Sequence, residues 1–341
     1  MTVNLLLRAD GGTEIGYGHL VRTSAVAEAV LEANGSVTVV TTTLEAAADV
    51  FPGSVDLVAI DSRDDPAPFV DVVDDLSPDV ALTDAYPVDT DYQRTVRDRV
   101  PLVVVDDLAR DSICADLLVN GNLYAPSLDY EFVGADPRTC LGTEYTLLRS
   151  AIRRFAIRQP PWHEVPERAL VTMGGSDVAE LTPTVVRAFD GMSIQVDVVV
   201  GPGVDASLEQ RIRAATTETA VTTDVTRDPA DLAARMFRAD LAISTASSAT
   251  YELLALGTPI VAIPVVANQE LIAEELRERD VATVLDRDVG SGRIREAVDR
   301  YVTDTEIRRD RRDRGRTLVD GRGVERIHAE LLSLVDDQSS A

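Results

Sequence analysis

The sequence contains no lysine, since all 33 of its basic residues are arginine. This absence excludes three kinds of chemistry. A Walker A loop needs a lysine to reach the phosphates of a nucleotide. Pyridoxal phosphate enzymes and class I aldolases each need a lysine amine to form a Schiff base.

Cysteine and histidine are also scarce. The two cysteines, Cys114 and Cys140, have neither the spacing of a zinc site nor that of a disulfide framework, so we interpret them as structural thiols. The three histidines, His19, His163 and His328, lie far apart in the sequence and form no ligand motif. We therefore expect no bound metal and no cofactor.

Long apolar runs are missing as well. No run approaches the roughly 20 residues that a helix needs to span a bilayer. The N-terminus has only the short run Val3–Leu7, which is followed by Arg8. We expect no membrane insertion, no signal peptide and a cytoplasmic location.

Acidic residues are abundant, and the net charge is −25. Such a chain is a poor partner for nucleic acid, because binding phosphates requires a basic surface. An acidic surface without lysine suits a high-salt cytoplasm, where ions screen the self-repulsion and hydrated carboxylates maintain solubility. The alternative is an acidic enzyme from an ordinary cytoplasm.

The length of 341 residues favours two domains, each with its own core. Apolar runs alternate with amphipathic helical patterns such as His19–Ala33, which ends at Asn34-Gly35. This alternation predicts an α/β protein with parallel sheets covered by helices on both faces. The predicted strands are Val3–Leu7, Val37–Thr41, Leu57–Ile60, Val80–Thr83, Leu102–Val105, Ala169–Met173, Ile194–Val200, Leu241–Ser244, Pro259–Pro264 and Ala282–Leu285.

The predicted elements fall into two Rossmann-like domains. We place the N-terminal domain at residues 1–155 and the C-terminal domain at 168–335. The linker between them, 156–167, contains Gln159-Pro160-Pro161-Trp162. Binding sites of such domains lie at the carboxyl ends of the strands, so we expect the two sheets to face each other across a cleft.

The stretch from Arg8 to Ser24 contains a glycine-rich loop between a predicted strand and a predicted helix. That order is typical of an anion or nucleotide site. The glycine spacing differs from Gly-x-Gly-x-x-Gly, and the second strand ends in Val39–Thr43 without an acidic residue to hold a ribose. Both features disfavour a nicotinamide cofactor.

His19 lies in the first turn of the predicted helix. The helix dipole disfavours the imidazolium form, and Arg22, three residues further on the same face, acts in the same direction. A neutral imidazole can accept a proton from water, so His19 is a candidate general base. The alternative is a helix-capping histidine without a chemical role.

The second half contains two further loops that precede helices. Gly174-Gly175-Ser176 follows one predicted strand, and Thr245–Thr250 follows another. Small residues of this kind let the backbone and hydroxyl groups donate hydrogen bonds to a diphosphate. Glu252 can accept from ribose hydroxyls, and Asn268 begins another helix. Each feature alone also fits an ordinary turn or helix cap.

In the first half, Asp84, Tyr86 and the pair Asp106-Asp107 follow predicted strands. In this fold class their side chains would face the cleft. The alternative is turn chemistry, which aspartate favours.

Together these motifs resemble a known family, the UDP-sugar hydrolases of the pseudaminic acid pathway. Its members remove UDP from UDP-2,4-diacetamido-2,4,6-trideoxy-β-L-altropyranose. The resemblance covers the chain from about residue 5 to about residue 275, and the Gly-x-Gly-His element is shared with MurG-type glycosyltransferases. The motifs are Arg8-x-Asp10, Ile15-Gly16-x-Gly18-His19-x-x-Arg22, Asp84-x-Tyr86, Asp106-Asp107, Asn120-x-Asn122, Leu141-Gly142-x-x-Tyr145-x-Leu147-Leu148-Arg149, Gly174-Gly175-Ser176-Asp177, Ala239-Asp240, Thr250-Tyr251-Glu252, Gly257-x-Pro259 and Asn268-Gln269.

The resemblance implies a GT-B fold in which UDP lies mainly on the second domain and the sugar extends toward His19, the catalytic residue. The family commonly has a glycine where this chain has Ser247 and Ser248, which leaves room for a changed diphosphate contact or a changed sugar. The residues implied for substrate binding are Asp10, Gly16, Gly18, Arg22, Asp84, Tyr86, Asn268 and Gln269, and those for UDP are Gly174, Gly175, Ser176, Ser247, Ser248, Thr250 and Glu252.

We therefore expect a metal-independent hydrolase that inverts the anomeric configuration, with a small UDP-sugar as its partner and a monomer or weak dimer as its assembly. One alternative is a glycosyltransferase on the same fold. Membrane-bound acceptors call for a basic or apolar patch, which the first half lacks, and this favours hydrolysis. The other alternative is a non-catalytic protein that binds sugar nucleotides.

Overall fold

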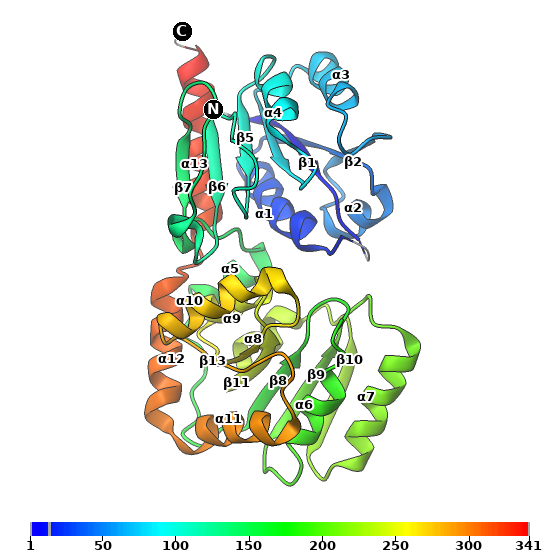
Figure 1. The fold of residues 1–341 in the computed structure, drawn as a ribbon, viewed down its shortest axis with the longest axis vertical. Helices are drawn as coiled ribbons and strands as arrows, with labels where there is room; N and C mark the ends of the chain where they lie inside the picture. Colours follow the sequence, from blue (N-terminus) through cyan, green and yellow to red (C-terminus); the bar gives the residue numbers. More distant parts are fainter. Residues whose placement is uncertain (1, 13–14, 340–341) are drawn as a thin grey trace. The chain divides into compact units, whose positions relative to one another are not determined.

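The computed structural model describes residues 2–12 and 15–339. It divides into two compact units (Figure 1). The first consists of Met1–Ser150 and Gly321–Ala341, and the second of Ala151–Asp320. Each unit has its own parallel sheet, which confirms the predicted fold class of two Rossmann-like domains. Among the described residues, no helix combines the length and the apolar character needed to cross a membrane.

The first unit is built on a seven-stranded parallel sheet with the order β3-β2-β1-β4-β5-β6-β7. Apolar side chains are buried on both of its faces, as expected for a sheet covered by helices. Its strands are β1 (Asn4–Ala9), β2 (Ser36–Thr41), β3 (Asp56–Ala59), β4 (Val80–Asp84), β5 (Leu102–Val105), β6 (Leu117–Asn120) and β7 (Arg138–Leu141). Its helices are α1 (Gly18–Glu32), α2 (Leu44–Val50), α3 (Ala67–Leu76), α4 (Thr90–Arg97) and α13 (Gly323–Ser339), with the short 3-10 turns η1 (Ala125–Ser127) and η2 (Thr143–Tyr145).

The second unit has a six-stranded parallel sheet with the order β10-β9-β8-β11-β12-β13. The strand order reverses between β8 and β11, as in a Rossmann fold. Its strands are β8 (Arg168–Thr172), β9 (Gln195–Val200), β10 (Thr222–Arg227), β11 (Leu241–Thr245), β12 (Ile260–Ile263) and β13 (Thr283–Val284). Its helices are α5 (Ser150–Ala156), α6 (Thr182–Ala188), α7 (Ala206–Glu218), α8 (Leu232–Arg238), α9 (Ser248–Leu256), α10 (Glu270–Glu278), α11 (Ser291–Thr303) and α12 (Thr305–Leu318), with the 3-10 turn η3 (Ala267–Gln269).

Every strand that was predicted from an apolar run is present, with ends that differ by at most two residues. Three strands were not predicted: β6, β7 and β10. Strands β7 and β10 are the edges of their sheets, and β10 reads Thr-Thr-Asp-Val-Thr-Arg. An edge strand is partly exposed and carries polar side chains, so it leaves no apolar run in the sequence.

Helix α13 belongs to the first unit, although it follows the second unit in the sequence. Its apolar residues Ile327, Leu331 and Leu334 are buried in the same core as Leu5 of β1. Figure 1 shows α13 beside β6 and β7. The predicted second domain, 168–335, includes most of this helix, whereas the structure assigns the helix to the first unit. The apolar stripe of α13 predicts that the helix is buried, but it does not specify the sheet that the helix covers.

The segment predicted as a linker is held against α12 by a row of arginines. Arg308, Arg312 and Arg316 recur every fourth residue of α12, so they share one face of the helix. Each donates hydrogen bonds to two backbone carbonyls within 156–164. The guanidinium groups of Arg308 and Arg312 also stack on the ring of Trp162. These contacts place 156–164 in the second unit, where it is fixed rather than free.

Candidate active site

The first part of the site is the loop between β1 and α1. Gly12 and Gly16 pair across it, with Gly16 N donating to Gly12 O at 2.7 Å. Gly16 has a φ of +89°, in the left-handed region where a glycine is strongly preferred. Gly18 begins α1 and places His19 in the first turn. Two residues of this loop, Thr13 and Glu14, lie outside the described part of the chain.

His19 forms a close pair with Asp84, which ends strand β4. The His19 Nδ1 atom lies 2.6 Å from Asp84 Oδ1. Strands β1 and β4 are neighbours in the sheet, so the loop after β1 and the end of β4 meet at the same edge. Both side chains are buried, at 9% and 1% exposure. The structure thus brings these two predicted residues into direct contact.

Arg22 lies one helical turn after His19 and contacts the same carboxylate. Its Nε donates to Asp84 Oδ2 and its Nη2 to Asp84 Oδ1, both at 2.6 Å. Burial alone would raise the pKa of Asp84, but the charges and hydrogen bonds of Arg22 and His19 hold that pKa well below its usual range. Asp84 is therefore an ionised carboxylate that can only accept hydrogen bonds.

This charge state fixes the tautomer of His19. An ionised Asp84 cannot donate, so at 2.6 Å the His19 Nδ1 atom must carry the proton and donate it to the carboxylate. In the neutral ring, Nε2 is then the basic nitrogen. Within residues 2–12 and 15–339 no group forms a hydrogen bond with Nε2. The pair can therefore present Nε2 as a proton acceptor while Asp84 orients the ring.

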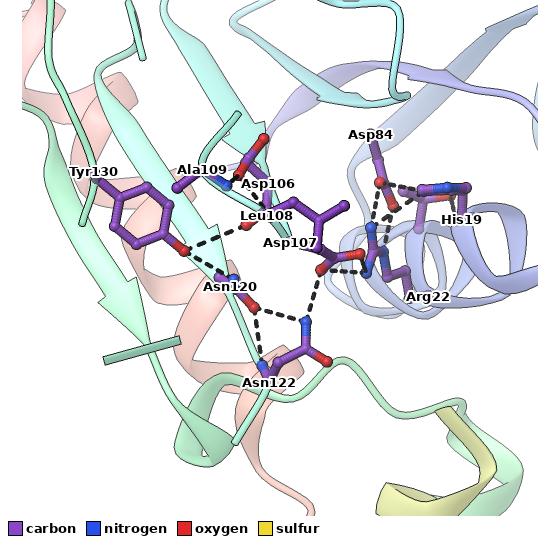
Figure 2. A network of polar contacts seen from close by, with 11 residues as sticks. His19, Arg22, Asp84, Asp106, Asp107, Leu108, Ala109, Asn120, Asn122 and Tyr130 are labelled. Atoms are coloured by element: carbon purple, nitrogen blue, oxygen red, sulfur yellow. Dashed lines mark hydrogen bonds and ion pairs between the residues drawn. The ribbon is translucent and has the colours of Figure 1, made fainter. Parts of the chain in front are cut away.

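Asp107 extends the network on the other side of Arg22 (Figure 2). Arg22 Nη1 donates to both carboxylate oxygens of Asp107, at 2.7 and 2.8 Å. Asn122 Nδ2 donates to Asp107 Oδ1 at 2.7 Å and to Asn120 Oδ1 at 2.8 Å. Asn120 in turn donates to the hydroxyl of Tyr130 at 2.8 Å. A continuous chain of polar contacts thus runs from Tyr130 to His19.

The two adjacent aspartates after β5 have different roles. Asp106 accepts the backbone N–H groups of Leu108 and Ala109, at 3.0 and 2.6 Å, and so forms the turn. Asp107 points to Arg22 instead. Burial raises the pKa of Asp106. Asp106 therefore stabilises a turn, whereas Asp107 belongs to the polar network around His19.

A small cavity lies next to His19. Its volume is about 20 Å³, and its lining includes Thr83, Tyr86 and Asp106. The Tyr86 ring meets the His19 ring edge to face, with centroids 4.7 Å apart. The Arg110 guanidinium lies over the Tyr86 ring, 4.8 Å from its centroid. A cavity of this size with polar walls can hold a water molecule.

Asp10, predicted to bind substrate, is occupied by contacts within the protein. Arg8 donates to both of its carboxylate oxygens, and Thr42 and Arg63 add further hydrogen bonds. Arg8 and Asp10 are 0% and 1% exposed. Burial raises the pKa of Asp10, but Arg8 and Thr42 outweigh it and hold the pKa at about 2. In this structure Asp10 joins the end of β1 to the turn after β2.

In the second unit, the turns after β8 and β9 pack against each other. Gly203 N donates to Gly175 O at 2.8 Å. A Cβ atom at Gly201 would lie 2.3 Å from Gly175 O and 2.5 Å from Gly174 O, so only glycine allows this approach. Ser176 follows this turn and is partly exposed. The predicted anion loop, Gly174-Gly175-Ser176, is thus shaped by the neighbouring turn.

The predicted UDP residues of the second loop surround the start of α9. Ser247 is the N-cap residue and Ser248 the first residue of the helix. The Ser247 hydroxyl lies 2.9 Å from the hydroxyl of Thr245. Thr250 is fully buried and donates to Thr245 O at 3.2 Å, so it stabilises the turn, while Glu252 is buried just after the first turn of α9.

The polar pair after β12 has two different environments. Gln269 accepts the backbone N–H of Val265 at 2.8 Å through its Oε1 atom, which closes the turn before α10. Asn268 is exposed, and its side chain makes no hydrogen bond with the described residues.

The structure therefore brings together one group of predicted residues, His19, Arg22, Asp84 and Tyr86, in the first unit. A second group, the loops after β8 and β11, lies at the carboxyl ends of neighbouring strands of the second unit. Sequence reasoning from spacing missed Tyr130 and Arg110. Both lie in loops, where no periodic pattern marks a side chain that points into a site.

The chain matches no protein-family model, and no curated protein matches its sequence. Its structure is similar to solved structures along nearly the whole chain. The calicheamicin glycosyltransferase CalG4 has a TM-score of 0.67 and 17% identity, with 98% of this chain and 99% of that chain covered. MurG of Acinetobacter baumannii has a TM-score of 0.68 and 13% identity, with 97% and 99% covered.

A putative UDP-N-acetylglucosamine 2-epimerase from Listeria monocytogenes is similar to the same extent. Its TM-score is 0.67 and its identity 13%, with 99% of this chain and 98% of that chain covered. At such low identities the likeness establishes the fold. The chain therefore has the GT-B fold.

Proposed function

We propose that this protein is a nucleotide-sugar hydrolase. It releases UDP from UDP-2,4-diacetamido-2,4,6-trideoxy-β-L-altropyranose, or from a close UDP-sugar, by attack of water at the anomeric carbon with inversion. The observation that carries the proposal is the His19–Asp84 pair at 2.6 Å beside a water-sized cavity. The GT-B fold and the resemblance of the motifs to the pseudaminic acid pathway hydrolases support the substrate class.

The residues of the first unit supply the proton chemistry. The oxygen of water attacks the anomeric carbon while the bond between that carbon and the β-phosphate oxygen breaks. The water passes its proton to His19 Nε2, and the electron pair of the broken bond leaves with UDP. Asp84 stabilises the imidazolium that forms, in the way that a buried carboxylate supports histidine in other hydrolases.

The residues of the second unit supply the diphosphate contacts in this proposal. UDP gains negative charge as it leaves. Backbone N–H groups near Ser176 and at the start of α9, by Ser248, are suited to stabilise that charge, because they are fixed in position before the reaction. Glu252 would accept from the ribose. No metal ion takes part, so a chelator such as EDTA should leave the rate unchanged.

Transfer of the sugar to an acceptor is the second candidate, since solved structures with this fold include CalG4 and MurG, both described above. The first half of the sequence lacks the basic or apolar patch that a membrane-bound acceptor would call for, which favours water as the attacking group. A third candidate is a protein that binds a sugar nucleotide without turnover. The complete His19–Asp84–Arg22 network disfavours it, because binding alone does not require a positioned base.

The test is UDP release from candidate UDP-sugars without an acceptor, in concentrated KCl, with the anomer of the free sugar identified by NMR. The His19→Ala variant should lose roughly 100- to 10,000-fold in rate and still bind substrate in calorimetry. Near-normal turnover in this variant would remove His19 from the mechanism.

His163→Ala is the matched control. His163 also pairs with a buried carboxylate, with its Nδ1 atom 3.0 Å from Asp240 Oδ1, but it lies in the segment held against α12. Its loss should leave UDP release unchanged. A UDP-sugar that is stable alone but consumed when an acceptor is added would favour the glycosyltransferase, and binding without any turnover would favour the binding protein.

A further inference from the structure

The polar network around His19 is supported by chain segments far from it in the sequence. We propose that Thr146 and Gly323 are positioning residues for His19, and that the start of helix α13 is therefore part of the active site's framework. The catalytic consequence rests on the proposed role of His19, whereas the positioning itself is independent of the reaction.

The backbone of Gly323 is in direct contact with the peptide that joins Tyr145 to Thr146. A Cβ atom at position 323 would lie 2.3 Å from Thr146 O and 2.6 Å from Tyr145 C. Real Cβ atoms do not approach backbone atoms so closely, so any side chain here must displace one of the segments. Arg326 strengthens the contact by donating to Glu144 O at 2.7 Å.

The same peptide contacts Gly121, which follows β6. A Cβ atom at position 121 would lie 2.7 Å from Thr146 Cα and 2.8 Å from Tyr145 O. The Thr146 hydroxyl donates to Gly121 O at 2.7 Å. The backbone at 145–146 therefore touches glycines both in the turn after β6 and at the start of α13.

Gly121 is the residue between the two asparagines of the network. Asn120 and Asn122 flank it, and Asn122 holds Asp107 at 2.7 Å. Asp107 holds Arg22, which binds the carboxylate paired with His19. Each of these contacts is a short, directional hydrogen bond, so a displacement at Gly121 must either be passed along the network or break one of its bonds.

The proposal predicts a defect in His19 geometry when the support is altered. Gly323→Ala forces the 145–146 peptide to move. Thr146→Val removes only the hydrogen bond to Gly121 and keeps nearly the same shape, so it tests the same contact if the alanine variant fails to fold. In each variant we expect kcat to fall by roughly 10- to 100-fold, because small misplacements of catalytic groups have effects of that size.

Two matched controls separate positioning from general stability. Gly290→Ala lies at the N-cap of α11, where an added Cβ would meet no atom within 4 Å. Thr258→Val removes a buried threonine hydroxyl that donates to Met236 O at 2.7 Å, the same type and length of bond as in Thr146. Both controls should leave kcat unchanged.

The decisive readout is NMR of the imidazole nitrogens. The chain has only three histidines, so the His19 signals can be assigned by comparison with His19→Ala. Gly323→Ala and Thr146→Val should shift the His19 nitrogen signals, and the controls should not. The KM for the UDP-sugar should stay within about twofold, since neither substitution removes a group that binds substrate.

His19 signals that superimpose on those of the unaltered protein in both variants would overturn the proposal, whatever their stability. A protein that releases no UDP from any UDP-sugar would contradict the proposed function instead. The NMR comparison would still test the positioning in that case.

Discussion

Replacing Asp84 with asparagine tests the chemical core of the site with a change of one atom. The Asp84 carboxylate is 1% exposed and accepts three hydrogen bonds at 2.6 Å, one from His19 and two from Arg22. An asparagine amide has one oxygen and one NH₂ group. In either orientation its NH₂ group faces a donor that the carboxylate had satisfied.

The effect on the rate follows from the tautomer of His19. In the orientation that places the amide NH₂ beside Nδ1, the ring with an unprotonated Nδ1 is favoured, which moves the ring proton to Nε2 and removes the base. In the serine proteases, the same replacement at the carboxylate behind the catalytic histidine lowers kcat by about 10⁴-fold. We expect UDP release by Asp84→Asn to fall by roughly 10³- to 10⁴-fold, which is about 4 to 5 kcal/mol in the barrier.

The effect on stability is smaller. Breaking a buried ion pair by removing one partner costs about 3–5 kcal/mol when the other charge is left alone. Arg22 keeps its two contacts with Asp107, at 2.7 and 2.8 Å, so its charge stays paired. We expect a loss of about 2 kcal/mol, typical of unsatisfied buried hydrogen-bonding groups.

The assay pairs UDP release with thermal unfolding. Asp240→Asn is the matched control, because Asp240 is also buried and accepts from a histidine and two backbone N–H groups. It should lower stability without a comparable loss of rate. If Asp84→Asn releases UDP at a rate within about tenfold of the unaltered protein, the carboxylate does not set the tautomer, and the argument fails.

Two further predictions concern Asp10 and the anion loop. The Asp10 pKa of about 2 lies below the value of about 3.9 for an unfolded chain, so the contacts with Arg8 and Thr42 together add about 2 to 3 kcal/mol of stability above pH 4, which is lost as the pH falls toward 2. Asp10→Asn should therefore have a lower free energy of unfolding than the unaltered protein at pH 7. Acid-unfolding curves should show this difference in stability vanish near pH 2. A difference that stays constant with pH would contradict the view that the ionised carboxylate provides the stability. Gly201→Ala should weaken UDP binding in calorimetry by about tenfold, because its Cβ would lie 2.3 Å from Gly175 O and distort the loop that we propose holds the diphosphate. The control is Gly292→Ala, because its added Cβ would have no atom within 4 Å. If Gly201→Ala and Gly292→Ala bind UDP with equal affinity, the loop does not hold the diphosphate.

The elements that carry the site could be predicted because their sequence signals are local. Strand β4 is an unbroken buried run, and α1 follows a glycine-rich turn, so the positions of Asp84 and His19 at the sheet edge follow from the alternation of strands and helices. Parallel topology then places both residues at the same edge.

The role of each aspartate could not be predicted in the same way. Asp10, Asp84, Asp106 and Asp107 all follow or end strands, yet only Asp84 and Asp107 reach the His19 network. The difference depends on partners that are distant in the sequence, such as Arg63 at Asp10 and Arg22 at Asp107. Neither is visible in residue spacing.

The contact between 145–146 and Gly323 escaped prediction for a related reason. It joins positions 146 and 323, which are 177 residues apart, through backbone atoms alone, and a glycine gives no hint of its neighbour in the sequence. The apolar residues of α13 recur with helical spacing in the sequence, but that pattern does not specify the surface that covers them.

The placement of α13 also affects the order in which the protein can mature. A ribosome makes the chain from its N-terminus, so β1 to β7 emerge long before Gly323, with all of Ala151–Asp320 synthesised in between. Until α13 leaves the ribosome, the peptide at 145–146 lacks one of its neighbours and the first sheet lacks a covering layer. Full activity would consequently require that α13 has been made and has packed on the first sheet, and a chain interrupted before Gly323 would carry every residue of the His19 network without this support.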